Sequence, residues 1–233
     1  VEFKKQNLDE VTIERKAEFT AKRSFYLVKL KELLHQRLEM DGLLHVYENI
    51  EKKLVPVLAN MEKTGILIDP KYFETYGNEL KLNLESIEKK IYELANEEFN
   101  INSPKQLSEI LFEKMLLDPV KKTKTGYSTD VEVLEVLASQ GVEISEKLLE
   151  YRGYTKLLTT YVEPLPKLVD ENNRIHTTFH QNGTATGRLS SSNPNIQNIP
   201  VKTSEGIKIR RGFVSKEGCS FISFDYSQIE LRV

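Results

Sequence analysis

Apolar residues recur every three or four positions through the first two thirds of the chain, which is the spacing of one face of an α-helix. The clearest run lies in residues 9–41, where Ile13, Ala17 and Ala21 follow one another at intervals of four. Residues 43–69 open with the same spacing and finish as a short apolar stretch that predicts a strand. The pattern predicts further helices over residues 70–97, 103–115, 129–141 and 145–161.

Residues whose side chains can cap a helix N-terminus stand before most of these helices. Asp69 is followed by a proline, which suits the first helical position. Ser103 and Thr129 each have a Gln or Glu three positions later, which is the pattern of a capping box. We expect Ser145 to cap the last helix of the series.

The pattern changes after about residue 170, where apolar and polar positions begin to alternate. Residues 174–181 alternate in this way and predict a strand, and the runs at 207–215 and 221–226 predict two more. The chain is therefore expected to have an α+β fold, in which mainly helical segments are followed by a partial antiparallel β region.

Composition excludes several classes of protein. The 233 residues include 33 Lys and Arg against 35 Asp and Glu, so net charge by itself points to neither nucleic acid nor membrane. A single cysteine, Cys219, excludes a disulfide framework and a cysteine-based zinc site, and favours a cytoplasmic location. No stretch approaches the roughly 20 apolar residues of a membrane span, so we expect no membrane partner. Because the chain starts at Val1 and not Met, and stops at Val233 within FISFDYSQIELRV before any turn or helix breaker, we expect a piece of a larger protein.

Basic residues gather around Lys121–Lys124 and Lys202–Arg211, beside glycine, serine or threonine. Such clusters are either solvated surface charge or phosphate contacts, since small neighbours let backbone N–H groups approach an anion. Arg152 and Lys156 stand four residues apart and share one helix face. That face suits solvent and DNA equally well, and both interpretations stay open.

Residues 184–200, TATGRLSSSNPNIQNIP, carry a single charge, Arg188, among small hydroxyl and amide side chains. Loops of this length inside compact domains are usually functional or disordered. The segment lacks the glycine and lysine pattern of a phosphate-binding P-loop, so we predict a functional loop of another kind. His176 and His180 precede it on one side of the predicted strand, but a metal site would need two further ligands.

Residues 221–232, FISFDYSQIELR, predict a buried strand that ends at Asp225. A carboxylate at a strand end is well placed to bind Mg²⁺, a hard cation that takes oxygen ligands. Asp225 could instead cap the following turn, with Glu230 as a carboxylate near the start of that turn. From these residues alone, capping is the favoured interpretation.

Taken in order, residues 184–200 and 225–232 resemble the palm of DNA polymerase family A, the bacterial DNA polymerase I type. A weaker likeness extends through residues 48–69, 99–107, 150–161 and 174–181. The resemblance implies three parts, which are the C-terminal tail of a 3′–5′ exonuclease-like domain over residues 1–44, the start of the polymerase domain with its helical thumb over 45–170, and a partial palm over 171–233.

The resemblance implies template-directed DNA synthesis, in which a primer 3′-hydroxyl attacks an incoming dNTP with the help of two Mg²⁺ ions. Asp225 matches the first catalytic carboxylate, and the carbonyl of Tyr226 would be a further metal ligand. Glu230 matches the residue that selects deoxyribose, and Gln228 would lie near the same sugar and the primer end. Lys202 would face the triphosphate of the dNTP.

The same resemblance implies that a primer–template duplex and dNTP are the partners of a monomeric enzyme. Arg188 would reach into the minor groove, where purine N3 and pyrimidine O2 are acceptors common to all correct base pairs. Further DNA contacts are expected from the loop residues Asn195, Gln197 and Asn198 and from the thumb residues Asn102, Ser103, Lys105 and Lys156.

Several positions depart from the family's pattern. Lys202 stands where an arginine is common, so the charge is kept but the planar fork is lost. Leu158 replaces a DNA-contacting lysine, and Asn193 replaces an aspartate. Arg15 and Phe19 occupy positions at which an active exonuclease needs a tyrosine and an aspartate, which predicts that proofreading is absent.

The family's fingers helix and second catalytic aspartate would follow Val233. One carboxylate cannot hold two ions, so the chain by itself is not expected to polymerise. An alternative hypothesis is a non-catalytic module that holds duplex DNA through its phosphates. A helical scaffold for protein partners would leave the two motif segments unexplained. A single-subunit RNA polymerase would share the palm chemistry, although Glu230 favours dNTPs.

Overall fold

The structure, a computed structural model, describes residues 11–123, 126–201 and 203–232. The chain divides into two compact units, Val1–Met61 and Glu62–Val233. The domain boundaries expected after residues 44 and 170 stay predictions. Within the described residues, no helix combines the length and the apolar character that crossing a membrane requires.

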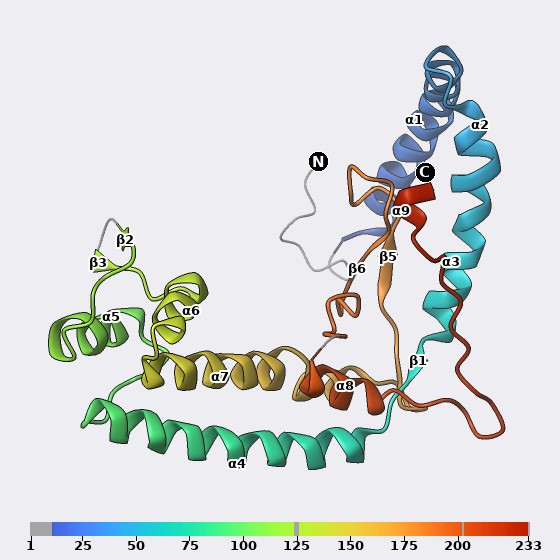
Figure 1. The fold of residues 1–233 in the computed structure, drawn as a ribbon. Helices are drawn as coiled ribbons and strands as arrows, with labels where there is room; N and C mark the ends of the chain where they lie inside the picture. The colour runs from blue at the N-terminus through green and yellow to red at the C-terminus, as the bar shows by residue number, and fades with distance from the viewer. Residues whose placement is uncertain (1–10, 124–125, 202, 233) are drawn as a thin grey trace. The chain divides into compact units, whose positions relative to one another are not determined.

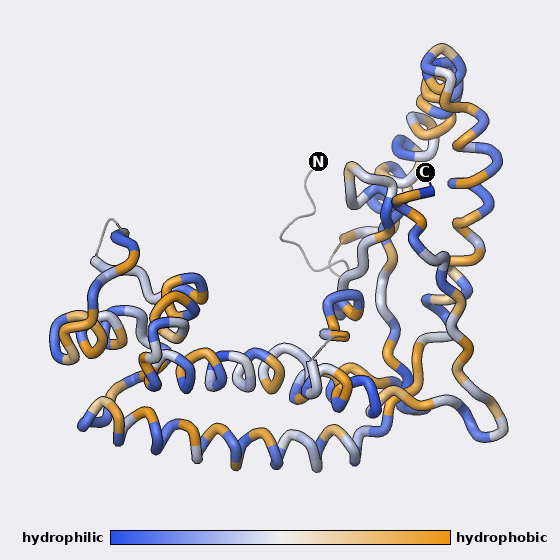
Figure 2. The backbone as a smooth tube through the Cα atoms, in the orientation of Figure 1, coloured by the Kyte–Doolittle hydropathy of each residue, from blue (hydrophilic) through white to orange (hydrophobic). Residues whose placement is uncertain are grey.

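The first unit is helical (Figure 1). Helix α1 spans Ile13–Met40, and the hydroxyl of its N-cap residue Thr12 accepts a hydrogen bond from the backbone N–H of Arg15. The helix predicted over residues 9–41 is thereby confirmed. Figure 2 shows many apolar positions along α1, yet none of its described side chains is buried. The segments that follow are α2 (Leu44–Val46), a π-helical stretch (Tyr47–Glu51) and α3 (Lys52–Thr64), which continues into the second unit.

Helices also make up most of the second unit (Figure 1). The long helix α4 (Pro70–Ala95) lies beside α7 (Glu143–Leu157), and the two pack along their length. Two shorter helices, α5 (Pro104–Ser108) and α6 (Val131–Ser139), lie between them in the sequence. The remaining helical segments are π-helical Glu109–Lys114 and Leu158–Val162, 3₁₀-helical Leu165–Leu168, α8 (Ser204–Arg211) and α9 (Ile229–Arg232).

Two predicted N-caps are confirmed. The Asp69 carboxylate accepts hydrogen bonds from the backbone N–H groups of Lys71 and Tyr72, at the start of α4. The Ser103 hydroxyl accepts one from the N–H of Gln106, at the start of α5. Each cap satisfies backbone donors that have no partner inside the helix.

Two other predicted N-caps are wrong. Helix α6 is capped by Asp130, one residue after Thr129, and the Asp130 carboxylate accepts a hydrogen bond from the N–H of Val133. Aspartate is the stronger capping residue, which explains the shift. Helix α7 has Val142 in its cap position, so Ser145 lies inside the helix. There the Ser145 hydroxyl is buried and has no hydrogen-bond partner among the described residues.

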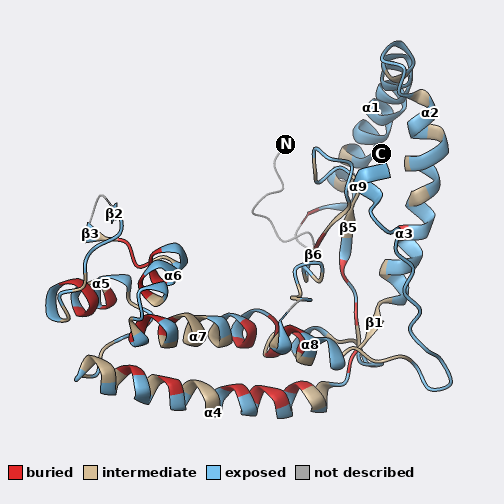
Figure 3. Ribbon diagram, viewed as in Figure 1, coloured by how far each residue is buried: buried red, intermediate tan, exposed pale blue. Residues whose placement is uncertain are grey.

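Two hydrophobic clusters hold the second unit together (Figure 3). The first joins the C-terminal half of α4 to α5, α6 and α7, and its fully buried side chains include Ile91, Leu107, Leu134 and Leu148. The second joins the N-terminal half of α4 to the end of α7, to β4 and to α8, with members that include Phe73, Leu80, Ile175 and Ile209. Burial of each such side chain contributes about 1.5–3 kcal/mol. The two clusters therefore pack α4 and α7 against each other and against α5, α6, β4 and α8.

The strands are short and antiparallel. Strand β1 (Ile66–Leu67) pairs with β4 (Arg174–Ile175), β2 (Lys122–Thr123) with β3 (Gly126–Tyr127), and β5 (Thr178–His180) with β6 (Ser190–Ser192). The strand predicted over residues 174–181 is thus two strands, β4 and β5, separated by His176 and Thr177. A mainly helical chain with short antiparallel strands confirms the predicted α+β class.

Two predicted strands are wrong. Most of residues 207–215 belongs to helix α8, which the Thr203 hydroxyl caps and in which Ile209 is buried. Residues 221–226 form no strand, and the side chain of Phe224 is exposed, with 92% of the residue accessible. A strand needs a neighbour that exchanges backbone hydrogen bonds with it, and no described segment pairs with this one.

Candidate nucleic-acid interface and metal-binding carboxylate

A tight turn presents Arg188 to solvent just before β6. The Thr184 hydroxyl donates a hydrogen bond to the Arg188 carbonyl at 2.7 Å, which closes the turn. Gly187 has a φ of 74°, in the left-handed region that glycine adopts at little steric cost. The Arg188 side chain is 77% exposed. The guanidinium is therefore available to a partner.

The amide side chains of the same loop are engaged within the loop. Asn195 Oδ1 accepts hydrogen bonds from the Ser191 hydroxyl at 3.2 Å and from the Gln197 N–H at 3.1 Å. Gln197 Nε2 donates to the Leu189 carbonyl at 3.2 Å. The carbonyl of Asn198 accepts from the Tyr161 hydroxyl. These contacts give the polar residues of the loop a defined structural role, and their contact with DNA stays a prediction.

The two motif segments of the chain meet at one ion pair. Arg188 Nη2 lies 3.5 Å from Glu230 Oε1, and the two side chains are 77% and 74% exposed. An ion pair this exposed contributes little to stability, because water screens it. The contact nevertheless shows that the arginine of residues 184–200 lies beside the carboxylate of residues 225–232.

The turn before α9 sets the position of Glu230. Gln228 occupies the position before the first residue of α9, has a φ of 56°, and accepts a hydrogen bond from the Leu231 N–H through its carbonyl. Arg232 Nε donates to the Ser227 carbonyl at 3.0 Å. Asp225 therefore does not cap α9, and the capping interpretation of this carboxylate is wrong.

Asp225 and Tyr226 are both exposed, and a carboxylate with a neighbouring carbonyl offers the oxygen ligands that Mg²⁺ takes. In the described part of the chain, no group of three or more His, Cys, Asp or Glu side chains is arranged so that it could hold a metal ion. One carboxylate and one carbonyl do not supply the ligands that two ions need. The described residues therefore do not fit a two-metal site by themselves.

Three of the four predicted thumb contacts lie around the start of α5, and the fourth, Lys156, lies on α7. Ser103 and Lys105 line a pocket together with residues 126–130 and Arg152. Asn102 lies next to them, and its Nδ2 donates to the Tyr151 hydroxyl at 3.5 Å. Contact of these residues with DNA stays a prediction, and the Ser103 hydroxyl is already occupied as an N-cap.

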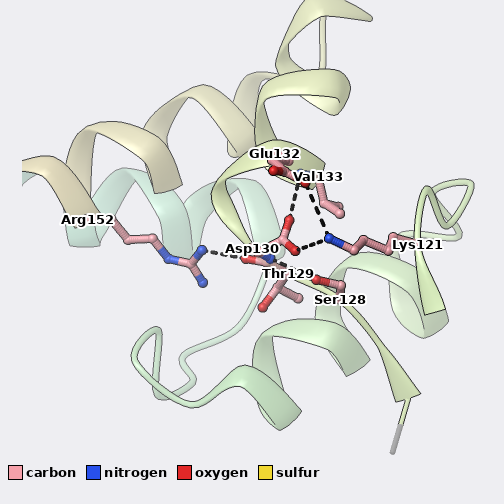
Figure 4. A network of polar contacts seen from close by, with 7 residues as sticks. All are labelled: Lys121, Ser128, Thr129, Asp130, Glu132, Val133 and Arg152. Carbon is pink, nitrogen blue, oxygen red and sulfur yellow. Dashed lines mark hydrogen bonds and ion pairs between the residues drawn. The ribbon is translucent and has the colours of Figure 1, made fainter. Parts of the chain in front are cut away.

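Lys121 pairs with the carboxylates of Asp130, which lines this pocket, and of Glu132 (Figure 4). Lys121 Nζ lies 3.0 Å from Asp130 Oδ2 and 3.3 Å from Glu132 Oε2. The N–H of Val133, then Lys121 and Ser128, hold the pKa of Asp130 at about 2. Lys121 is thus bound to carboxylates, which favours the surface-charge interpretation over a phosphate contact at this residue.

Arg152 and Lys156 differ in environment although they share one helix. The Arg152 guanidinium donates to the Thr129 carbonyl (Figure 4), and burial lowers its pKa. Lys156 is exposed. Arg152 therefore holds α7 to the segment before α6, a role that the sequence did not indicate, because its partner is a backbone group 23 residues away.

The second predicted basic cluster also includes a structural residue. Lys208 Nζ lies 2.6 Å from Glu79 Oε1 and 5.6 Å from the centre of the Tyr76 ring, so it holds α8 to α4. Lys124 and Lys202 lie outside the described residues.

The two histidines do not share a site. His176 Nδ1 lies 2.7 Å from the Glu62 carbonyl and its Nε2 lies 3.1 Å from Asp170 Oδ2, whereas His180 Nε2 lies 2.7 Å from the Ser192 hydroxyl. The bond to the Glu62 carbonyl, then the one to Asp170, raises the pKa of His176. Both its ring nitrogens face acceptors within the chain, so neither is available to bind a metal.

The model of DNA polymerase family A matches residues 70–233. The chain belongs to DNA polymerase family A. The match includes every predicted site residue, from Asn102 to Glu230.

Bacterial DNA polymerases I are similar over nearly the whole chain. The DNA polymerase I of Caldicellulosiruptor bescii is 52% identical over 208 residues, which are 89% of this chain and 24% of the relative. That of Rhizobium leguminosarum is 48% identical over 97% of this chain and 22% of the relative. That of Bacillus subtilis is 47% identical over 93% of this chain and 25% of the relative. The chain thus spans about a quarter of the length of these relatives.

A solved structure supports the same family. It is described as the POL domain of Pol1 from M. smegmatis in complex with a DNA primer-template and dNTP. The TM-score is 0.79 at 37% identity, over 88% of this chain and 36% of that one. The fold described above is therefore that of part of a polymerase domain.

Proposed function

We propose that this chain forms the primer–template surface and carries the first catalytic carboxylate of a template-directed DNA polymerase. The observation that carries the proposal is the meeting of Arg188 with Glu230, at 3.5 Å, within a chain of family A. Because the chain spans about a quarter of its relatives, we further propose that it belongs to a longer polymerase that joins dNTPs to a primer 3′-hydroxyl.

In this proposal Arg188 reads the shape of the newest base pair. Purine N3 and pyrimidine O2 occupy similar places in the minor groove of every correct pair, so an arginine there senses pairing and not sequence. The exposed guanidinium of Arg188 is free to make such contacts when it leaves Glu230. Glu230 and Gln228 would then lie at the sugar of the incoming dNTP, and Lys202 at its triphosphate.

Asp225 and the Tyr226 carbonyl would contribute ligands to two Mg²⁺ ions. The longer protein must supply at least one more carboxylate, because the ligands described here are too few for two ions. We therefore propose that the 233-residue chain on its own binds DNA without extending a primer.

The thumb would hold the duplex through its phosphates. Asn102, Ser103 and Lys105 lie together at the start of α5, and Lys156 is exposed on α7. The loop amides of Asn195, Gln197 and Asn198 would add contacts on the primer side. A monomer in the cytoplasm, acting in replication or repair, is the setting that we propose, and the single cysteine, Cys219, is compatible with it.

The parts of the chain follow from the same proposal. Residues 1–44 would be the tail of an exonuclease-like domain, 45–170 the start of the polymerase domain with its thumb, and 171–233 a partial palm. Arg15 and Phe19 are the reason to propose that the exonuclease-like domain does not proofread.

Primer extension by the longer polymerase tests the central role of Asp225. Asp225→Ala should abolish extension, because the carboxylate that holds metal is lost, while affinity for primer–template stays unchanged. Asp118→Ala, at another exposed aspartate of the second unit, is the matched control and should extend normally. Near-normal extension by Asp225→Ala would refute the assignment.

A non-catalytic DNA-binding module is the second candidate, since the exposed Lys105 and Lys156 would serve its phosphate contacts equally well. It predicts that the longer protein binds primer–template but shows no extension even with Asp225 intact. The same assay therefore distinguishes the two functions.

A further inference from the structure

A buried threonine holds the turn that follows β6. Thr177 is 7% exposed, and its hydroxyl lies 2.6 Å from the Pro194 carbonyl oxygen and 3.1 Å from that of Ser192. The hydroxyl has one proton, so it donates mainly to the nearer carbonyl, that of Pro194. The two carbonyls flank Asn193, whose φ of 56° lies in the left-handed region. One side chain thus holds both sides of the turn.

A series of short contacts leads from this turn to Arg188. Asn195 directly follows Pro194, and its Oδ1 accepts a hydrogen bond from the Gln197 N–H at 3.1 Å. Gln197 Nε2 in turn donates to the carbonyl of Leu189 at 3.2 Å, one residue after Arg188. A shift of the turn would therefore displace the residues that face the primer end in the proposed function.

We propose that Thr177 is a positioning residue for primer extension. Its hydroxyl sets the place of Asn195, Gln197 and Arg188 against the minor groove, although Thr177 is buried and touches no DNA itself. The inference rests on the proposed function of the loop. The essential group is the hydroxyl and not the bulk of the side chain, because only the hydroxyl can donate a hydrogen bond to the turn, chiefly to the Pro194 carbonyl.

The isosteric change Thr177→Val removes the donor and keeps the volume. In the longer polymerase it should lower the extension rate from a matched primer end roughly tenfold. It should also reduce the ratio between extension from matched and from mismatched primer ends. This ratio does not depend on the fraction of enzyme that is folded, so a merely structural role would leave it unchanged.

Two further variants give the comparison its controls. Thr177→Ser keeps the hydroxyl and should restore both the rate and the ratio. Thr75→Val removes an exposed hydroxyl that donates within α4, to the Lys71 carbonyl, and should change neither. A normal ratio in Thr177→Val, or a reduced one in Thr177→Ser, would overturn the inference.

The route through Arg188 is tested with a double variant. If Thr177 acts by placing Arg188, Thr177→Val should lower the ratio far less when Arg188→Ala is already present, and full additivity would contradict the proposal. Should Thr177→Val fail to fold, Ser191→Ala replaces it, because the buried Ser191 hydroxyl donates to Asn195 in the same loop.

The two proposals fail in different ways. If Arg188→Ala alone has a normal ratio between matched and mismatched extension, the proposed function of the loop is refuted. If Arg188→Ala has a reduced ratio and Thr177→Val a normal one, only the proposed role of Thr177 is refuted.

Discussion

Arg188 is the residue on which the proposed function depends most. Its guanidinium is 77% exposed and lies 3.5 Å from Glu230. An exposed ion pair contributes little free energy, so Arg188 can leave Glu230 and contact minor-groove acceptors at a small energetic cost. Glu230 would also hold the guanidinium near the primer end before DNA arrives. The pair thus orients Arg188 without restraining it strongly.

Arg188→Ala should lower the extension rate of the longer polymerase by roughly tenfold to a hundredfold, because contacts to the base pair are lost at the reacting end. Affinity for dNTP should change far less, since Arg188 does not face the nucleotide phosphates in this proposal. Single-turnover extension over a range of dNTP concentrations separates the two quantities.

Arg37→Ala is the matched control, because Arg37 is an exposed arginine of α1 in an ion pair with Asp41 at 2.8 Å. It should extend at the normal rate. Equal losses in Arg37→Ala and Arg188→Ala would argue against a specific role for Arg188.

The C-terminal end of α3 is tied to β4 and to His176, the residue that follows it. Arg174 Nη1 donates to the Thr64 carbonyl at 3.2 Å, and His176 Nδ1 lies 2.7 Å from the Glu62 carbonyl. Asp170 accepts from the Arg174 N–H at 2.8 Å and faces His176 Nε2 at 3.1 Å. Neither carbonyl nor carboxylate donates, so the imidazolium form of His176 suits both contacts.

These contacts predict a pH dependence of stability. The pKa of His176 is raised above its ordinary value of 6.5 by the Glu62 carbonyl and by Asp170. A raised pKa means that the stabilisation is fully present below the unfolded value and is lost as pH rises through the folded value. The melting temperature of the chain should therefore exceed that of His176→Gln at about pH 5.5, and the difference should shrink towards about pH 8.5.

His180→Gln is the matched control for this series, since His180 faces the Ser192 hydroxyl and not a carboxylate. Its melting temperature should follow that of the unchanged chain with pH. If the difference in melting temperature between the unchanged chain and His176→Gln grew as pH rises, it would contradict the expectation that protonated His176 stabilises the fold.

Both units are mainly helical, and the second also carries exposed loops. The two hydrophobic clusters lie in the second unit, and Asp225, Arg188 and Glu230 lie on its exposed segments. The apolar side chains of the two clusters thus differ from the exposed residues that are proposed to contact DNA and dNTP. Binding of DNA should depend chiefly on basic side chains that remain accessible, such as Lys105 and Lys156.

The chain should therefore bind primer–template with an affinity that falls steeply as salt rises, and should not extend the primer. Each phosphate contact contributes a slope of about −0.9 to log K against log salt. Lys105→Ala and Lys156→Ala should each make the slope shallower by about one, as measured by fluorescence anisotropy across a salt series.

Lys90→Ala provides the comparison for this series, because Lys90 is an exposed α4 lysine that pairs with Glu93. Its slope should equal that of the unchanged chain. Binding that does not respond to salt would rule out the phosphate contacts.

Local patterns in the sequence predict most of the helices and the resemblance to the family. The apolar spacing of α1 and α4 and the caps at Asp69 and Ser103 depend on residues within one or two helical turns, so they can be read directly from the sequence. The motif segments at 184–200 and 225–232 were recognisable for the same reason, as contiguous runs of residues.

Contacts between distant segments were decided by the fold alone. The short alternation at 207–215 suits a strand or a helix, and burial of Ile209 against α4 selected the helix. Residues 221–226 have strand-like chemistry but no described partner to pair with. Hydrogen bonds such as that of Thr177 to Pro194, and the meeting of Arg188 with Glu230, join residues that no spacing rule relates. Periodicity reports neighbours along one element, whereas such contacts depend on how separate elements pack.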